Sequence, residues 1–297
     1  MTRRLRRPLS MIALLLTLIE GARGGGAWTQ RSDDYYIKID ATWTSGDQEF
    51  DFNGERRLLF PDTSAARHGT FGMTELGFYV ELGLSDRITA IAATQYKVAV
   101  REARLVRAER DTAISSSGLS DLWLGGRVAL MNRESPVALS TTVSIKVPTG
   151  SPLQEMPLGS GQVDYEIGAD IGVSYKAGSV GWGWAEGGIA FRMRNGAADE
   201  VVYSAGTGLD VGSGITLMSR FEGIASRADF DGAAIDPDRV ATWARLNGNS
   251  SYHRLVVDLI YRSSSTLQIS LGYRALLSGR NIVDADGVAI GLAWTRP

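Results

Sequence analysis

Residues 161 to 179 read GQVDYEIGADIGVSYKAGS, and this stretch decides the fold class. Every second residue from Gln162 to Ser174 is polar or glycine, while the alternate residues from Val163 to Tyr175 are apolar or aromatic. A period of two predicts a β-strand with one apolar and one polar face. The alternation persists over fourteen residues, whereas strands of globular proteins usually have about 5 or 6. This length indicates an environment other than a soluble core.

A membrane accounts for both the length and the two faces. Transmembrane strands have about 9 to 11 residues and are tilted by about 45°. Tyr165 and Tyr175 lie ten residues apart on the apolar face, which corresponds to roughly 23 Å of height at that tilt. The apolar band of outer-membrane barrels is about 25 Å tall and is edged by aromatic side chains. We therefore predict a strand with lipid on one face and the barrel interior on the other.

The same alternation recurs along residues 28–297. It predicts strands at 35–44, 75–84, 88–100, 122–130, 137–147, 162–175, 180–194, 201–211, 215–224, 252–262, 266–274 and 288–294. Tight turns alternate with longer polar loops at 45–69, 102–117, 148–161, 195–200, 225–249 and 276–286. An even strand number with short turns on one side and long loops on the other is typical of outer-membrane barrels.

The expected fold is therefore all-β. It is a single closed antiparallel transmembrane β-barrel of about twelve strands in an up-and-down meander. In such a barrel the long loops are extracellular, and we expect this of loops 45–69, 102–117, 148–161 and 225–249. Trp43, Tyr96, Tyr261, Tyr273 and Trp294 lie near predicted strand ends, where aromatic girdles are found.

Residues 1–27 have the layout of a secretory signal peptide. Four arginines precede the apolar run 9–19, which is too short for a spanning helix of about 20 residues. An uncleaved anchor is the alternative reading; a soluble amphipathic helix is disfavoured because the run has no polar face. Gly25 and Ala27 suit cleavage before Trp28.

Composition excludes several functions. The chain has 44% hydrophobic residues, 35 glycines and no cysteine, so disulfide frameworks, zinc knuckles and thiol nucleophiles are excluded. Signal cleavage would remove five arginines and one glutamate from a chain whose net charge is already −2. The mature protein is then acidic and offers no basic face to nucleic acid. We predict no metal site and no cofactor.

Several phrases occur in an informative order. They are GLSDRITA (83–90), SGLSDLWLGGRVAL (117–130), SIKVPTG (144–150), PLGSGQVDYEIG (157–168) and LGYRALLSGRN (271–281). In this order and spacing the chain resembles a family of bacterial outer-membrane β-barrels assigned to transport in the phenol meta-cleavage pathway, over roughly residues 70 to 294. The resemblance implies a Gram-negative outer-membrane location and passage of small, apolar or aromatic molecules.

The last residues of the sequence differ from the usual C-terminal pattern of outer-membrane barrels. Such barrels commonly end on an aromatic residue used in assembly, whereas Trp294 is followed here by Thr295, Arg296 and Pro297. The expected partners are outer-membrane lipid and lipopolysaccharide, the barrel-assembly machinery and a small-molecule solute.

Strand parity predicts which charged side chains point inward. The candidate lumen-lining residues are Lys38, Asp40, Glu75, Glu81, Arg87, Lys97, Asp121, Arg127, Lys146, Asp164, Glu166, Asp170, Arg192, Arg220, Glu222, Arg254, Asp258 and Arg274. These charges either line a narrow conduit or pair into a network that blocks it. Eight strands are filled by side chains and about 16 to 18 leave a water channel, so twelve strands leave both options open. Inward glycines favour the conduit.

Other candidate sites are weaker. His68 and His253 are the two histidines, and Ser251 shares a strand face with His253, but no third catalytic member is evident. We therefore predict that the protein is not an enzyme and that His253 is a rim residue. The loop 227–239 carries four aspartates without calcium-loop spacing. Arg101, Arg104, Arg107 and Arg110 lie in a predicted loop where contact with anionic lipopolysaccharide is conceivable.

The sequence thus predicts a narrow passive channel or transporter for small molecules. A non-transporting barrel with a structural or surface-interaction role is the alternative. A lipid-modifying enzyme ranks third.

Overall fold

The computed structural model describes residues 26–59, 66–105, 110–132, 135–154, 156–227 and 249–296. Side chains at 66–68, 104, 105 and 110 are outside this description. The strands are β1 (Tyr35–Phe50), β2 (Arg56–Leu58), β3 (Ala66–Ser85), β4 (Ile88–Leu105), β5 (Arg110–Leu119), β6 (Leu122–Ala129), β7 (Val137–Val147), β8 (Asp164–Ala177), β9 (Gly181–Arg194), β10 (Glu200–Gly212), β11 (Ile215–Ser226), β12 (Ser251–Arg262), β13 (Leu267–Arg280) and β14 (Ile282–Thr295).

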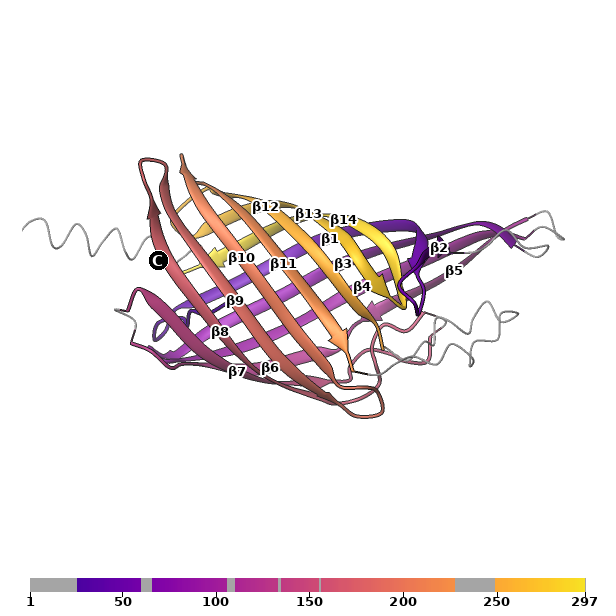
Figure 1. Cartoon of the computed structure of the whole chain (residues 1–297), viewed down its shortest axis with the longest axis horizontal. Helices are drawn as coiled ribbons and strands as arrows, with labels where there is room; N and C mark the ends of the chain where they lie inside the picture. The colour runs from indigo at the N-terminus through magenta and orange to yellow at the C-terminus, as the bar shows by residue number, and fades with distance from the viewer. Residues whose placement is uncertain are drawn as a thin grey trace, which may run out of the picture.

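These strands form one closed antiparallel barrel (Figure 1). Apart from β2 and β5, each strand pairs with the next along the chain, and β14 returns to pair with β1, with Ile37 opposite Trp294. β5 and β6 both pair with β4 and act as one strand of the wall, while β2 pairs only with the end of β1. The barrel therefore has twelve strands in its wall, and the predicted fold class is confirmed.

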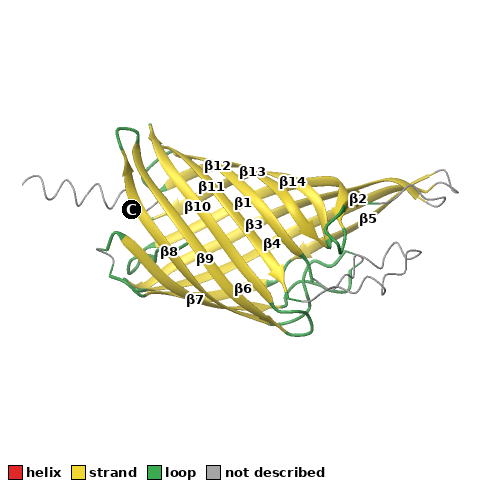
Figure 2. Ribbon diagram, viewed as in Figure 1, coloured by secondary structure: helices red, strands yellow, loops and turns green. Residues whose placement is uncertain are grey.

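The two faces of the wall differ as the alternation predicted. On β8, Tyr165, Ile167 and Ile171 are 52%, 51% and 54% exposed, whereas Asp164 is 1% exposed. The aromatic residues Trp43, Tyr96, Tyr175, Tyr261 and Tyr273 are also exposed on the outside of the barrel. Apolar side chains on the outside and charged ones inside are the arrangement of a barrel in lipid rather than of two stacked sheets. All the described regular structure is β (Figure 2), and none of it is a helix long and apolar enough to span a bilayer.

The predicted loops 45–69 and 102–117 are wrong in part. β1 and β3 enter the first range from both sides, and β4 and β5 enter the second. The range 276–286 is likewise strand except at Asn281, which turns the chain with a φ of 52°. Alternation fails there because both faces of a ribbon outside the bilayer can meet water, while backbone pairing continues. In Figure 1 the extensions of β3, β4 and β5 project beyond the barrel at one end.

The range 148–161 has no strand among its described residues and folds back against β5. Among the described strands, β5 has no partner on the side away from β4. There Ser116 Oγ accepts a 3.1 Å hydrogen bond from the backbone of Met156, and Met156 and Leu158 are buried. An unpaired strand edge is thereby covered by a loop.

Candidate functional site

The barrel interior has two unlike sides. We call the side formed by β6 to β10 the filled side, and the side formed by β11 to β14 with β1, β3 and β4 the open side. Charged side chains in mutual contact occupy the first, and a cavity of about 910 Å³ occupies the second. All twelve wall strands alternate alike, so the difference comes from the inward residues.

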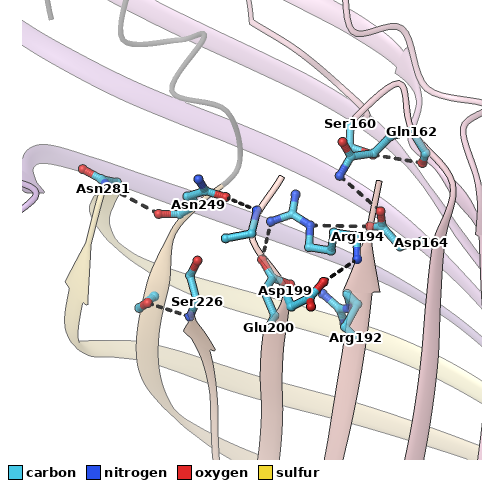
Figure 3. A network of polar contacts seen from close by, with 12 residues as sticks. Ser160, Gln162, Asp164, Arg192, Arg194, Asp199, Glu200, Ser226, Asn249 and Asn281 are labelled. Carbon is cyan, nitrogen blue, oxygen red and sulfur yellow. Dashed lines mark hydrogen bonds and ion pairs between the residues drawn. The ribbon is translucent and has the colours of Figure 1, made fainter. Parts of the chain in front are cut away.

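A chain of ion pairs crosses the filled side near the long-loop end. Arg192 bridges Glu166 at 2.8 Å and Glu200 at 2.9 Å. Arg194 contacts Glu200 at 2.6 Å and Asp164 at 3.7 Å (Figure 3). The sequence did not single out Arg194 and Glu200, although Arg194 shares its strand parity with Arg192.

The chain of ion pairs continues to the base of the 148–161 loop. Lys146 contacts Asp164 directly and lies 3.7 Å from Asp121. Asp121 in turn accepts hydrogen bonds from the backbone of Gly150 at 3.1 Å and of Ser160 at 2.9 Å. The acidic and basic groups here are almost fully buried. Buried charges that satisfy one another make this side a rigid support rather than a water path.

Small residues create the space on the open side. β14 contributes Gly287, Ala289, Gly291 and Ala293 to the interior, opposite Thr44, Thr42, Asp40 and Lys38 of β1. The cavity is lined across to Met218 and Arg220 on β11. Its volume is within the range of about 300 to 1,000 Å³ found for small-molecule sites.

The charges around this cavity are balanced once the partners behind its lining are included, because Arg127 pairs with Glu81 at 2.8 Å and Arg220 with Glu186 at 3.2 Å. Six basic side chains line it (Lys38, Lys97, Arg127, Arg220, Arg254 and Arg274), with four carboxylates (Asp40, Glu75, Glu222 and Asp258). Lys97 pairs with Glu75 at 3.2 Å, and Arg254 donates to Glu222 at 2.8 Å. Arg274 Nη1 is buried without a hydrogen-bond partner. An anionic group in the cavity could satisfy it.

A second hollow of about 220 Å³, which we call the mouth pocket, adjoins the cavity at the long-loop end. The two share Phe71, Met73, Lys97, Ile282 and Val283. The mouth pocket also contacts Phe50, Arg101, Met156 and Leu158. Arg101 was predicted to lie in an exposed loop; instead it is on β4 and only 5% exposed, because β4 continues through that range.

The residues before β1 enter the barrel at the opposite, short-turn end. Arg127 donates a 3.1 Å hydrogen bond to the carbonyl of Trp28, and Gln30 Nε2 donates to Glu81 at 2.6 Å. The indole of Trp28 packs edge-on against Trp184 at 6.3 Å between ring centroids. The alternation gave no signal for this segment, which is too short and polar to be read as a strand.

The eighteen candidate lumen residues fall into distinct places. Ten line the cavity: Lys38, Asp40, Glu75, Lys97, Arg127, Arg220, Glu222, Arg254, Asp258 and Arg274. Glu81 lies beneath Arg127 at 2.8 Å, and Asp170 faces Gly188 on the filled side. The ion-pair chain contains Asp121, Lys146, Asp164, Glu166 and Arg192. Arg87 is exposed at a short turn, bonded to Asn132.

The described residues around His253 do not form a catalytic Ser/His arrangement. Its Nδ1 lies 2.6 Å from the hydroxyl of Tyr203, and its ring stacks on Phe221 at 5.7 Å. Ser251 Oγ instead accepts from the backbone of Ser226 at 2.9 Å. The His68 side chain, residues 1–25, the aspartates of 227–239 and Arg107 are outside the described residues, as are the Arg104 and Arg110 side chains.

Comparisons with known proteins agree with this architecture. No protein-family model and no curated protein matches the sequence. The crystal structure of the COG4313 outer membrane channel from Pseudomonas putida F1 is similar, with a TM-score of 0.63 at 13% identity, covering 92% of this chain and 99% of that chain. The translocator domain of the autotransporter NalP from Neisseria meningitidis gives a TM-score of 0.45 at 12% identity, covering 96% and 95%. The chain has the fold of outer-membrane β-barrels, and its apolar outer face belongs in a lipid bilayer.

Proposed function

We propose that the protein is a passive outer-membrane channel for small solutes, with the long loops outside the cell. The observation that carries this proposal is the continuous hollow on the open side. It begins at the mouth pocket, continues through the polar cavity and reaches Tyr36, Tyr79 and Arg127 near the short-turn end. Charged side chains along the wall of this hollow keep it hydrated, so polar solutes can enter it.

The character of the hollow suggests the solute class. Its upper part has apolar walls at Phe71, Met73 and Ile282, and its lower part is polar and contains the unsatisfied Nη1 of Arg274. A small molecule with an apolar or aromatic body and an anionic group fits both parts. This agrees with the resemblance to barrels of the phenol meta-cleavage pathway.

A non-transporting structural barrel is the second candidate. It is favoured by the ion-pair chain and by the segment around Trp28, which together leave only one side of the interior hollow. The two candidates differ in whether ions cross.

Planar-bilayer recording of the purified barrel separates them. A channel gives stepwise currents whose size scales with salt concentration. Absence of any current, in the natural chain and in variants that lack the segment around Trp28, would reject the channel and leave the structural candidate. Folding of each preparation is checked by the shift in gel mobility on heating.

A further inference from the structure

The segment from Trp28 to Asp34 crosses the interior at the short-turn end. Trp28 contacts β9 through Trp184 and β6 through Arg127. Two residues later, the backbone of Gln30 donates a 2.7 Å hydrogen bond to Thr89 on β4, and its side chain bonds Glu81 on β3. In the closed order of the wall, β3 and β9 are nearly opposite. The segment therefore spans the width of the barrel.

The wall is shaped to receive this segment. A Cβ on Gly172 of β8 would overlap the indole ring of Trp28, and one on Gly83 of β3 would overlap the carbonyl of Arg31. Glycine at these two inward positions therefore leaves the room that the segment takes. Thr29 is 7% exposed, so this part of the segment lies within the barrel, whereas Ser32 and Asp33 are exposed at the rim.

The contacts that hold the segment are mostly polar and therefore reversible in water. Residues 29–34 read TQRSDD, all of them polar. Their hydrogen bonds join groups that water can also satisfy, as with Thr29 Oγ1, which donates to the carbonyl of Asp86 at 3.2 Å. Trp28 supplies the single large apolar contact. Water can hydrate these polar groups when the segment is away from the wall.

A hinge joins the segment to β1. Asp33 adopts a φ of 65°, in the left-handed region, and its backbone N–H donates to the carbonyl of Gly83 at 3.0 Å. From Asp34 to Trp28 an extended chain reaches roughly 20 Å. That reach is enough to clear the end of the barrel while β1 stays in place.

We propose that Trp28 to Ser32 form a tethered plug that closes the short-turn end of the conduit and leaves it when the channel opens. We call the contact of the Trp28 indole with Gly172 the latch. The side chains of Arg127, Thr89 and Glu81 hold the plug by hydrogen bonds. The proposal rests on the channel function proposed above. The cavity reaches this end at Gly26, two residues before Trp28, and at Arg127, whose guanidinium donates to the carbonyl of Trp28.

A double-mutant cycle in planar bilayers tests the latch. Trp28→Ala removes the indole, and Gly172→Ala fills the space that the indole occupies; each is expected to raise the open probability severalfold. Because both act on one contact, the double variant is expected to open no more than Trp28→Ala alone. Gly187→Ala is the matched control, since Gly187 lies on neighbouring β9, faces outward and has its nearest atom, the carbonyl oxygen of Ser204, at 3.7 Å from an added Cβ.

A disulfide tether tests the plug without weakening it. The chain contains no cysteine, so Gln30→Cys with Thr89→Cys can form only the intended bond. Oxidation is expected to close the channel and reduction to restore opening, while either single variant responds to neither treatment. Bond formation is measured by mass spectrometry. If the disulfide does not form, the double-mutant cycle of Trp28 and Gly172 tests the plug by itself.

The outcomes separate the two proposals. Equal opening of the natural chain, Trp28→Ala and Gly172→Ala, with clear currents in all three, would overturn the plug and leave the channel. Currents in none of them would overturn both. Additive effects of the two substitutions would show that they act at different places and would also overturn the latch.

Discussion

The filled and open sides of the barrel share one strand pattern but differ in what the inward residues do. On the filled side Lys146, Arg192 and Arg194 satisfy buried carboxylates. On the open side β14 offers glycine and alanine, and the charges of neighbouring strands face a cavity. Alternation therefore specifies that a residue faces inward, and side-chain size and pairing decide whether the space is filled.

The largest expected difference between the two sides is in stability. Lys146→Ala removes the cation of buried Asp121 and leaves Asp164 with Arg194 alone at 3.7 Å, and breaking such a buried pair costs about 3 to 5 kcal/mol. Lys97→Ala breaks the pair with Glu75, whose side chains are 24% and 16% exposed to the cavity, and costs about 1 kcal/mol or less. Urea unfolding followed by gel mobility measures both. Equal losses of unfolding free energy in the two variants would mean that both sides of the interior exclude water equally.

A lipid-facing substitution is expected to cost slightly less. Ile171→Arg places a charge on the outer face between Tyr165 and Tyr175 and costs about 2 to 4 kcal/mol near the bilayer midplane. Tyr165→Arg lies nearer a strand end, where the cost falls to about 0 to 1 kcal/mol. Unfolding from lipid vesicles measures the pair. Tolerance of Ile171→Arg equal to that of Tyr165→Arg would contradict the lipid-facing assignment.

Bulk placed on the open side should reduce current. Thr44→Trp points an indole into the cavity, and a side chain that buries about 150 to 250 Å² should remove roughly half of the single-channel conductance or more. Ala41→Trp is the control, because Ala41 is on the same strand with opposite parity. Unchanged conductance in Thr44→Trp would exclude the open side as the path.

The smallest expected effect concerns ion preference. Arg274 lines the cavity with Nη1 unsatisfied, so Arg274→Gln should lower the preference for anions over cations. The reversal potential in a salt gradient measures it. Lys176→Gln removes the same charge from the exposed end of β8 and should leave the potential as it was. A shift of equal size in both variants would place the selective charge outside the cavity.

Sequence alternation was sufficient to predict the barrel, its twelve wall strands and the outward placement of Ile167 and Tyr175. It could not predict the strand extensions outside the bilayer, because water on both faces removes the period of two. Parity predicted the inward charges, but it could not show that Lys146 is paired in a buried network while Lys38 faces a cavity.

Two further features depend on contacts distant in sequence. Arg87 was expected to line the lumen, but it lies at a turn, where parity loses meaning. The segment at Trp28 finds its partners at Thr89, Arg127 and Trp184, and nothing in residues 28–34 themselves points to those strands.

Thiol labelling of single cysteine variants during bilayer recording tests the claim that solutes pass along the open side. Ser270 lines the cavity on β13, and Ser204 faces inward on β10 of the filled side, opposite Gly188. With no natural cysteine in the chain, a charged water-soluble thiol reagent should reduce the current through Ser270→Cys and leave Ser204→Cys unchanged. Block of Ser204→Cys with no effect on Ser270→Cys would contradict the account.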